Sequence, residues 1–229
     1  MKIILSLALC ILNIHAQDIP NPNRFKDNLM GDNVSIDLFR LWDKKNSIPE
    51  SPIVFVGSSS IRKWFTSKYF PDISIINRGF GGSHISDVNF YLYDIVLKYN
   101  PIGVVLYAGD NDINYGKSSK IVFEDYISFV KQIHSQLPST EIVFIAIKPS
   151  LSRWGLWDEM KEANRLIEEY CNQKKSLHFL DTASPMLDDN GLPKKSLYLD
   201  DGLHLNEEGY ELWNKILYPV IRSLIAKND

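Results

Sequence analysis

The chain has 229 residues and a formal net charge of -3, with 23% charged and 45% hydrophobic side chains. This length suits one domain of ordinary size with a substantial buried core, and the composition is that of a globular protein, not of a disordered one. The slightly negative charge offers no broad basic surface for a phosphate backbone, so we expect no nucleic acid partner.

The first residues of the chain differ in character from the rest. Lys2 precedes an apolar run over residues 3–12, and Ala16 provides a small side chain after which a signal peptidase could cut. The run is too short to anchor the protein permanently in a bilayer. Cys10 follows a leucine instead of a small residue, which argues against a lipoprotein. We therefore predict a signal peptide over residues 1–16, export to a periplasmic or extracellular site, and no stable membrane insertion.

The sequence contains two cysteines, and removal of the signal peptide would remove Cys10 and leave Cys171. An exported protein would then have no internal disulfide, and its stability would come from its core. Cys171 lies near the end of a helical pattern over residues 157–173. That position predicts a buried structural thiol and not a nucleophile.

A helical pattern also precedes the main part of the chain. Apolar residues recur at helical spacing between residues 25 and 42, and Asn33 is a candidate N-cap for this helix. We expect residues 17–50 to form an N-terminal helical extension packed on a single main domain of residues 51–229.

Short apolar runs alternate with helical patterns through the main domain. The predicted strands cover residues 53–56, 73–76, 102–107, 141–147 and 177–180. The predicted helices cover residues 88–97, 123–137 and 157–173, and a last helix from Asn206 should kink or break at Pro219. Strands that are almost continuously apolar and separated by helices require a parallel sheet covered on both faces. The predicted fold class is therefore α/β, a flavodoxin-like three-layer α/β/α sandwich with a five-stranded parallel sheet.

Polar loops follow the ends of several predicted strands, where ligands bind in such sheets. Within these loops, Ser59 could act as a nucleophile and His204 as the base that takes its proton. Asp201 lies three residues before His204, so its carboxylate could bond the second imidazole nitrogen. Natural donors to an oxyanion are the backbone N–H groups of Ser59 and Gly82 and the side-chain amide of Asn111. Together these residues predict acyl transfer through a serine.

The same residues carry a family resemblance. Gly57-Ser58-Ser59, Gly82, Gly109-Asp110-Asn111-Asp112 and Asp201-Gly202-Leu203-His204 resemble, in this order, the four signature blocks of the SGNH (GDSL-type) hydrolase superfamily. The resemblance implies the SGNH hydrolase fold, a carboxylic ester hydrolase without a metal or organic cofactor, and a triad completed by Asp201. Ser59, Gly82, Asn111 and His204 then correspond to the residues that name the superfamily. Ser58 stands where the name-giving pattern has aspartate, which bears on hydrogen bonding within the turn more than on the chemistry.

Other residues compete for the roles of base and orienting acid. His84 lies close to the glycine-rich turn that we predict over residues 77–82, but its nearest acid, Asp87, lies where a helix is expected to begin. His134 falls within a predicted helix and His178 within a predicted strand, so both are expected to be structural. Asp200 competes with Asp201, and the spacing to the histidine favours Asp201.

The substrate is predicted from the loop that follows residues 141–147. Arg153 and Trp154 offer a cation and an aromatic face, which suit a sugar or another polar alcohol. We expect the substrate to be a small-molecule or glycan ester with a short acyl group. Within that class, we expect an acetyl ester on a carbohydrate. The alternatives are a lysophospholipase or thioesterase of the same family, an inactive glycan-binding relative, or a metal-dependent phosphoesterase that uses Asp110, Asn111, Asp112, Asp201 and His204. The sequence makes no prediction of oligomeric state.

Overall fold

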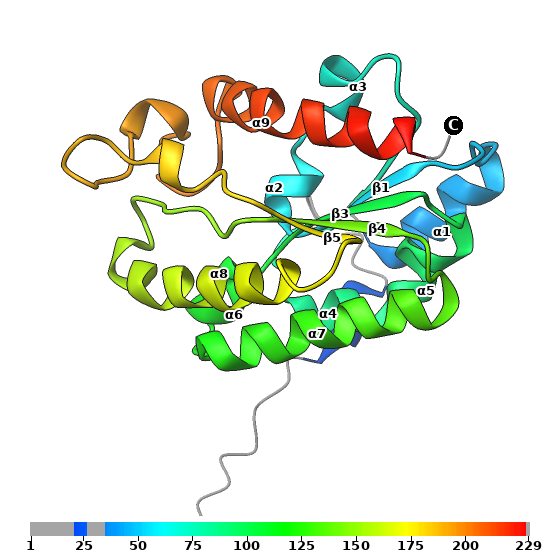
Figure 1. Cartoon of the computed structure of the whole chain (residues 1–229), viewed down its shortest axis with the longest axis horizontal. Helices are drawn as coiled ribbons and strands as arrows, with labels where there is room; N and C mark the ends of the chain where they lie inside the picture. The colour runs from blue at the N-terminus through cyan, green and yellow to red at the C-terminus, as the bar shows by residue number, and fades with distance from the viewer. Residues whose placement is uncertain (1–20, 27–34, 228–229) are drawn as a thin grey trace, which may run out of the picture.

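The computed structural model describes residues 21–26 and 35–227 of the chain. A central sheet lies between two layers of helices (Figure 1). Its strands are β1 (Ile53–Gly57), β2 (Ile75–Gly79), β3 (Gly103–Tyr107), β4 (Glu141–Ile145) and β5 (Leu177–Leu180). They pair in the order β2-β1-β3-β4-β5, and every pair is parallel. This is the strand order of flavodoxin-like folds, so the predicted fold class is confirmed.

The helices cover both faces of the sheet. One face packs against α1 (Ile36–Lys45), α4 (Ile85–Phe90), α5 (Leu92–Ile95), α6 (Asp110–Asn114), α7 (Ser119–Gln136) and α8 (Trp157–Cys171). The other face packs against α2 (Ser59–Arg62), α3 (Thr66–Tyr69) and α9 (Glu207–Ala226) (Figure 1). Short 3-10 helices complete the chain, namely η1 (Pro22–Phe25), η2 (Leu97–Tyr99), η3 (Trp154–Leu156), η4 (Ser184–Met186) and η5 (Lys195–Leu197).

The core is divided by the sheet, because successive side chains of a strand point to opposite faces. In β1, Val54 and Val56 belong to the cluster under α7 and α8, whereas Ile53 and Phe55 belong to the cluster under α9. All four side chains are fully buried. Coverage on both sides explains why the central strands read as continuous apolar runs and not as alternating ones.

Several predicted boundaries need correction. Strand β2 begins at Ile75 and continues to Gly79, because Asn77 and Arg78 pair with β1 and are not part of a turn. The N-cap of α1 is Ser35, whereas Asn33 lies outside the described residues.

The last helix, α9, does not break where the sequence predicted. It continues past Pro219 as one helix, and both Pro219 and Lys215, whose carbonyl would otherwise bond the missing N–H, are exposed. Water can satisfy that carbonyl on the outer face, so the proline is tolerated there.

The N-terminal helix packs closely on the domain. Phe39 of α1 is buried in the core, Arg40 bonds both carboxylate oxygens of Asp94 on α5, and Asp43 forms an ion pair with Arg78 of β2. The predicted signal peptide lies outside the described residues. Within residues 21–26 and 35–227, no helix is long and apolar enough to cross a membrane.

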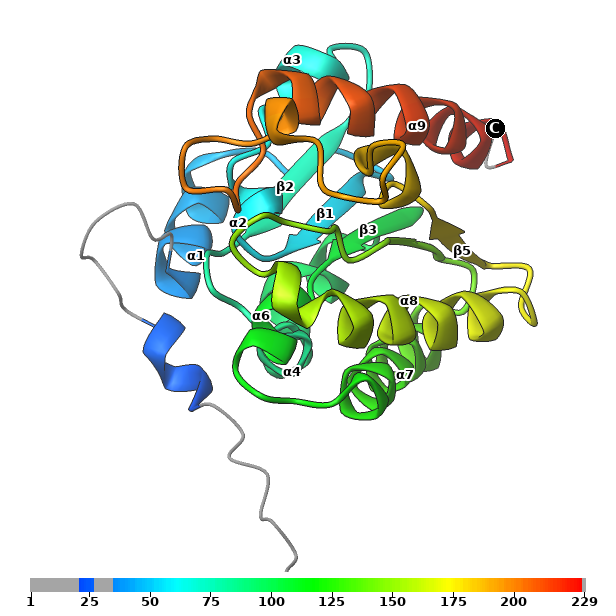
Figure 2. The same cartoon turned by 90° about the vertical axis from the view of Figure 1, so that its left-hand side faces the viewer.

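The carboxyl ends of the central strands are joined by hydrogen bonds. The N–H of Ser58, after β1, donates to Tyr107 O at the end of β3 (3.0 Å), and Phe80 N, after β2, donates to Gly57 O (2.9 Å). Gly57 has φ +127°, and a Cβ there would lie 1.9 Å from Tyr107 O, so only glycine fits. Three loops are thereby fixed side by side at one edge of the sheet, and Figure 2 is viewed from the side on which α2 and α6 leave it.

Candidate active site

The nucleophile candidate lies at a sharp strand-to-helix turn. Ser59 is the first residue of α2, directly after β1 and the N-cap residue Ser58. The N–H of a first helical residue has no partner inside its own helix. Ser58 is buried, and its hydroxyl has no hydrogen-bond partner among the described residues, where the family pattern has an aspartate. The turn therefore presents one serine hydroxyl to the site and encloses the other.

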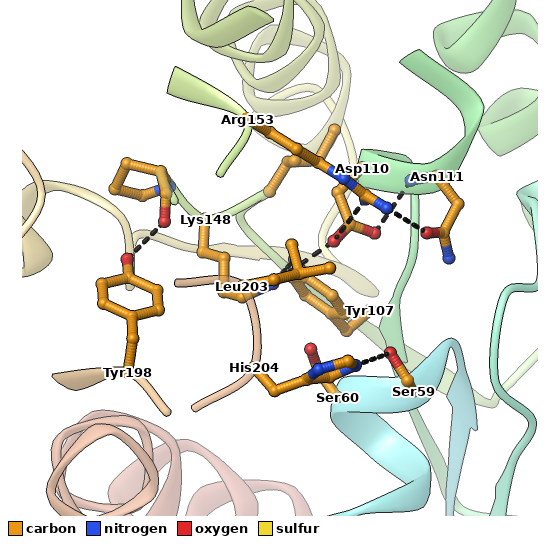
Figure 3. Close-up of polar contacts among 12 residues, drawn as sticks. Ser59, Ser60, Tyr107, Asp110, Asn111, Lys148, Arg153, Tyr198, Leu203 and His204 are labelled. Carbon is orange, nitrogen blue, oxygen red and sulfur yellow. Dashed lines mark hydrogen bonds and ion pairs between the residues drawn. The ribbon is translucent and has the colours of Figure 1, made fainter. Parts of the chain in front are cut away.

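The histidine and aspartate candidates lie together on the loop that precedes α9. His204 Nε2 lies 2.9 Å from Ser59 Oγ, and His204 Nδ1 lies 2.5 Å from Asp201 Oδ2 (Figure 3). The other oxygen of Asp201, Oδ1, accepts the backbone N–H groups of Leu203 (2.8 Å) and His204 (2.9 Å). The structure thus brings Ser59, His204 and Asp201 into one continuous chain of hydrogen bonds.

The charge of Asp201 decides which nitrogen of His204 carries the proton. Partial burial alone would raise the pKa of Asp201, but the hydrogen bonds from the imidazole and from two backbone N–H groups lower it to about 2. An ionised carboxylate only accepts hydrogen bonds, so Nδ1 of His204 carries the ring proton and the Nε2 lone pair faces Ser59. Asp200 is exposed and makes no hydrogen bond or ion pair within the described residues. This geometry selects Asp201 over Asp200.

The three oxyanion candidates lie on adjoining loops. Gly82 is exposed in the turn after β2 with φ +79°, and its N–H has no hydrogen-bond partner in the described part of the chain. Asn111 lies on the first turn of α6, and its amide nitrogen donates to Ser83 O (3.1 Å), next to Gly82 in the chain. An amide nitrogen has two hydrogens, so one remains available. Together with Ser59 N–H, these groups can supply donors to an oxyanion.

The predicted substrate residues Arg153 and Trp154 lie at the start of η3, and both have contacts within the protein. Arg153 Nη2 donates to Asn111 Oδ1 (3.0 Å), and its Nη1 lies 3.3 Å from Asp110 Oδ2 (Figure 3). Trp154 stacks on Trp157 with ring centres 6.1 Å apart and packs against the core. The guanidinium is therefore engaged with the loop after β3.

The sequence interpretation missed the buried charges behind Asn111. Lys148 is fully buried and bonds Tyr107 Oη (2.9 Å) and Asp110 Oδ2 (3.3 Å). Burial alone would raise the pKa of Asp110, but Lys148 and Arg153 hold it below its ordinary value. The sequence does contain one signal for this network, because Lys148 directly follows the apolar run over residues 142–147. A lysine buried at such a position requires an anion beside it.

The rival histidines have other roles in the structure. His84 caps α4, and Asp87 accepts the His84 backbone N–H (2.8 Å), as the sequence suggested. Burial lowers the pKa of His84 to about 3, so its ring is neutral. His134 contacts Thr140 O (2.9 Å), and His178 pairs with a glutamate at the start of β4. Among the described residues, the histidine that bonds the Ser59 hydroxyl is His204 and not one of these three.

The thiol of Cys171 lies in the core. Cys171 is buried at the end of α8, and its sulfur lies 3.2 Å from Tyr126 Oη. Burial raises the pKa of the Cys171 thiol to about 11. A protonated, buried thiol is a poor nucleophile, which agrees with the structural role predicted.

The carboxylates proposed as metal ligands each face a different partner. Asp110 faces Lys148 and Arg153, whereas Asp112 is buried against Lys117 and the N–H of Ile85. No group of three His, Cys, Asp or Glu side chains that could hold a metal ion occurs in residues 21–26 and 35–227.

A groove of about 520 Å³ lies between α2, α3 and the start of α9, and Ser59, Asp201 and His204 are not among its lining residues. Its lining includes Arg62, on the same short helix as Ser59, and Leu205, which follows His204. Phe65 stands in this groove with 76% of its surface exposed. Part of its lining therefore comes from segments that adjoin two triad residues in the chain.

Comparisons with known proteins find solved structures with the same fold. A GDSL-like lipase from Bacteroides thetaiotaomicron is 20% identical and has a TM-score of 0.71, covering 82% of this chain and 97% of its own. A family 3 carbohydrate esterase from Clostridium thermocellum is 18% identical with a TM-score of 0.61, covering 77% and 99%.

The acetyl-xylooligosaccharide esterase Axe2 from Geobacillus stearothermophilus, in a mutant form, is 14% identical with a TM-score of 0.59, covering 75% of this chain and 94% of its own. These identities show a shared fold. The search of curated proteins gives no match. The model of the GDSL-like Lipase/Acylhydrolase family matches residues 57–212, which include every residue of the hydrogen-bonded chain described above. The chain therefore belongs to the GDSL-like lipase/acylhydrolase family and is a carboxylic ester hydrolase.

Proposed function

We propose that this esterase removes a short acyl group, an acetyl, from a carbohydrate ester through a Ser59-His204-Asp201 triad. The observation that carries the proposal is the hydrogen-bonded chain from Asp201 through His204 to the Ser59 hydroxyl, with distances of 2.5 Å and 2.9 Å. A serine hydroxyl is a weak nucleophile until an adjacent base accepts its proton, and this arrangement supplies that base in the required tautomer.

The reaction proceeds in two steps. Ser59 Oγ attacks the carbonyl carbon while its proton moves to His204 Nε2, and Asp201 stabilises the imidazolium that forms. The tetrahedral intermediate then expels the alcohol, which takes the proton from Nε2 and leaves acetyl-Ser59. In the second step a water molecule gives a proton to Nε2 and attacks the acyl group. Return of that proton to Ser59 Oγ releases acetate and restores the enzyme.

The negative charge of each tetrahedral intermediate would lie among the donors of Ser59 N–H, Gly82 N–H and the Asn111 amide. Asn111→Ala removes one of these donors from a fixed position. We expect kcat for p-nitrophenyl acetate to fall by about a hundredfold to a thousandfold, since one such donor contributes roughly 2.7 to 4 kcal/mol to the transition state. Steady-state kinetics with a melting curve for each protein measure this loss. A variant with wild-type kcat would remove Asn111 from the mechanism.

The choice of a carbohydrate acetyl ester is supported by two observations. Two of the compared structures are, by name, a carbohydrate esterase and an acetyl-xylooligosaccharide esterase. The groove beside α2 and α3 also offers the exposed ring of Phe65 together with the polar side chain of Lys63. Sugars bind to aromatic faces flanked by hydrogen-bonding groups. We place the sugar of the leaving alcohol in this groove.

Phe65→Ala tests the position of the sugar. Loss of the ring should raise KM for an acetylated xylooligosaccharide several-fold, on the order of 1 kcal/mol for a stacked aromatic ring, and leave KM and kcat for p-nitrophenyl acetate unchanged. The matched control is Phe90→Ala, which removes a similarly exposed ring (62% against 76%) from α4 on the opposite face of the sheet. An equal change in both variants, or no change in either, would contradict the placement.

The acyl group is tested by a series of p-nitrophenyl esters with acetate, butyrate and octanoate, alongside acetylated glycans. We expect kcat/KM to be highest for the acetate and to fall with chain length. Dominant hydrolysis of octanoate would replace the acetyl proposal with the lysophospholipase or thioesterase alternative. Binding of the esters without turnover would indicate a glycan-binding relative.

We also propose that the enzyme acts outside the cytoplasm after cleavage behind Ala16. The proposal rests on Lys2 and the apolar run over residues 3–12. Mass spectrometry of the protein expressed in its native host tests it, with a mature chain beginning at Gln17 as the expected result.

A further inference from the structure

The side chain of Asn111 can stabilise an oxyanion in only one of its two orientations. The amide has a hydrogen-bond acceptor at one end and donors at the other, and the two ends have nearly the same size. Shape alone therefore does not decide which end faces Ser59. If the amide turned by 180°, its oxygen would face the developing negative charge and raise the barrier to reaction.

Neighbouring groups decide the orientation of the Asn111 amide. Arg153 Nη2 lies 3.0 Å from Asn111 Oδ1, and a guanidinium can only donate. The carbonyl of Ser83 lies 3.1 Å from Asn111 Nδ2, and a carbonyl can only accept. Both contacts require the same orientation. The contact with Ser83 uses one hydrogen of Nδ2 and leaves the second available, and Figure 3 shows this nitrogen at the end of the side chain nearer Ser59.

Arg153 is itself held in place. Its side chain is 13% exposed, and Nη1 lies 3.3 Å from Asp110 Oδ2. Asp110 is fixed in turn by Lys148 Nζ at 3.3 Å and by the backbone N–H of Asn111, which donates to Asp110 Oδ1 at 2.9 Å. The contacts therefore form a closed ring, in which the backbone of Asn111 helps to fix Asp110, Asp110 fixes Arg153, and Arg153 orients the Asn111 side chain.

The charges of this network also favour the reaction. Two cations, Arg153 and Lys148, surround one anion, Asp110, so the cluster is positive by one unit behind Asn111. The side chains of Lys148 and Asp110 are 1% and 6% exposed, so water screens this charge little. Positive charge behind the amide favours an oxyanion in front of it.

We infer that Arg153 is a positioning residue for the oxyanion hole, which sets and holds the Asn111 amide and is itself fixed by the Asp110–Lys148 pair. The inference rests on the proposed Ser59 mechanism. It assigns Arg153 to the transition state instead of to a contact with the sugar. Loss of Arg153 should therefore lower kcat and leave KM nearly unchanged, because the free enzyme and the bound ester do not use the oriented donor.

The test is a double-mutant cycle with wild type, Arg153→Ala, Asn111→Ala and the double variant, assayed on p-nitrophenyl acetate. We expect Arg153→Ala alone to lower kcat at least tenfold, a loss equivalent to about 1.4 kcal/mol. In the Asn111→Ala background the same substitution should lower kcat by clearly less than in the wild type, because no amide remains to be oriented and only the loss of one positive charge is left. Equal losses in both backgrounds, or a raised KM with unchanged kcat, would overturn the inference.

Matched variants separate positioning from folding. Arg153→Lys keeps the charge beside Asp110 but loses the planar fork that reaches both Asp110 and Asn111, so it should restore the melting temperature more than it restores kcat. Asp110 keeps Lys148 as its partner in either variant, so we expect both to fold. Arg165→Ala is the control for loss of an arginine and should retain wild-type kcat, since among the described residues Arg165 pairs only with exposed glutamates on α8.

The same cycle distinguishes this inference from the function on which it rests. Ser59→Ala is assayed beside the four proteins. If the wild-type activity persists without Ser59, the proposed mechanism fails and the role of Arg153 fails with it. If the activity requires Ser59 but the two losses multiply, only the role of Arg153 is wrong.

Discussion

Ser59→Ala is expected to abolish ester hydrolysis above background while the protein remains folded. The hydroxyl lies 2.9 Å from His204 Nε2, and no other serine hydroxyl in the described part of the chain bonds that imidazole. In a serine protease with the same arrangement, removal of the nucleophile lowers kcat on the order of 10⁶-fold. We expect a loss of this scale in kcat for p-nitrophenyl acetate, with a melting temperature close to that of the wild type.

The neighbouring serine provides the matched control. Ser58 is one residue away, but its buried hydroxyl has no hydrogen-bond partner among the described residues. Removal of an unpaired buried hydroxyl leaves no partner unsatisfied, so Ser58→Ala should keep both activity and stability within a small factor. Substantial turnover by Ser59→Ala, or an equal loss in Ser58→Ala, would show that the hydroxyl of Ser59 is not the nucleophile.

Asp201→Asn is expected to produce the second largest loss, about 10⁴-fold in kcat by analogy with the corresponding change in a serine protease. The substituted amide can donate a hydrogen bond to Nδ1 of His204. The ring proton would then lie on Nε2, where the lone pair must face Ser59. Because Asp201 is 47% exposed at its side chain, we expect little change in folding stability.

Asp200→Asn is the paired control for this prediction. The two aspartates are adjacent in the chain and differ in their contacts, because only Asp201 bonds the histidine. Asp200→Asn should therefore keep wild-type kcat. A large loss in Asp200→Asn with a small one in Asp201→Asn would reverse the assignment of the orienting carboxylate.

The main features of the fold could be predicted because they depend on local patterns. Apolar runs separated by helical patterns specify a parallel sheet covered on both faces, and Gly57 marks the turn at which β1 ends. Parallel strands bring the loops at their carboxyl ends to one edge of the sheet. The proximity of Ser59 and His204, 145 positions apart, was predicted from this rule together with the family resemblance.

The features that could not be predicted depend on tertiary contacts. Asn77 and Arg78 read as turn residues, yet they pair with β1 and extend β2. Pro219 lies on the exposed side of α9, where the missing hydrogen bond is tolerated, and only the packing of the helix reveals which side that is. Arg153 reads as a free cation in a loop until Asp110 and Asn111 are seen beside it, 43 and 42 positions earlier in the chain.

The central claim is that Ser59 carries the acyl group during turnover, and covalent labelling with a fluorophosphonate tests it most directly. The enzyme is treated with the reagent, its intact mass is measured, the modified peptide is sequenced, and the remaining esterase activity is recorded with and without EDTA. The account predicts one adduct, on Ser59, with activity lost in proportion to labelling and unaffected by EDTA. An adduct on another residue, full activity after complete labelling of Ser59, or activity that EDTA abolishes would contradict it.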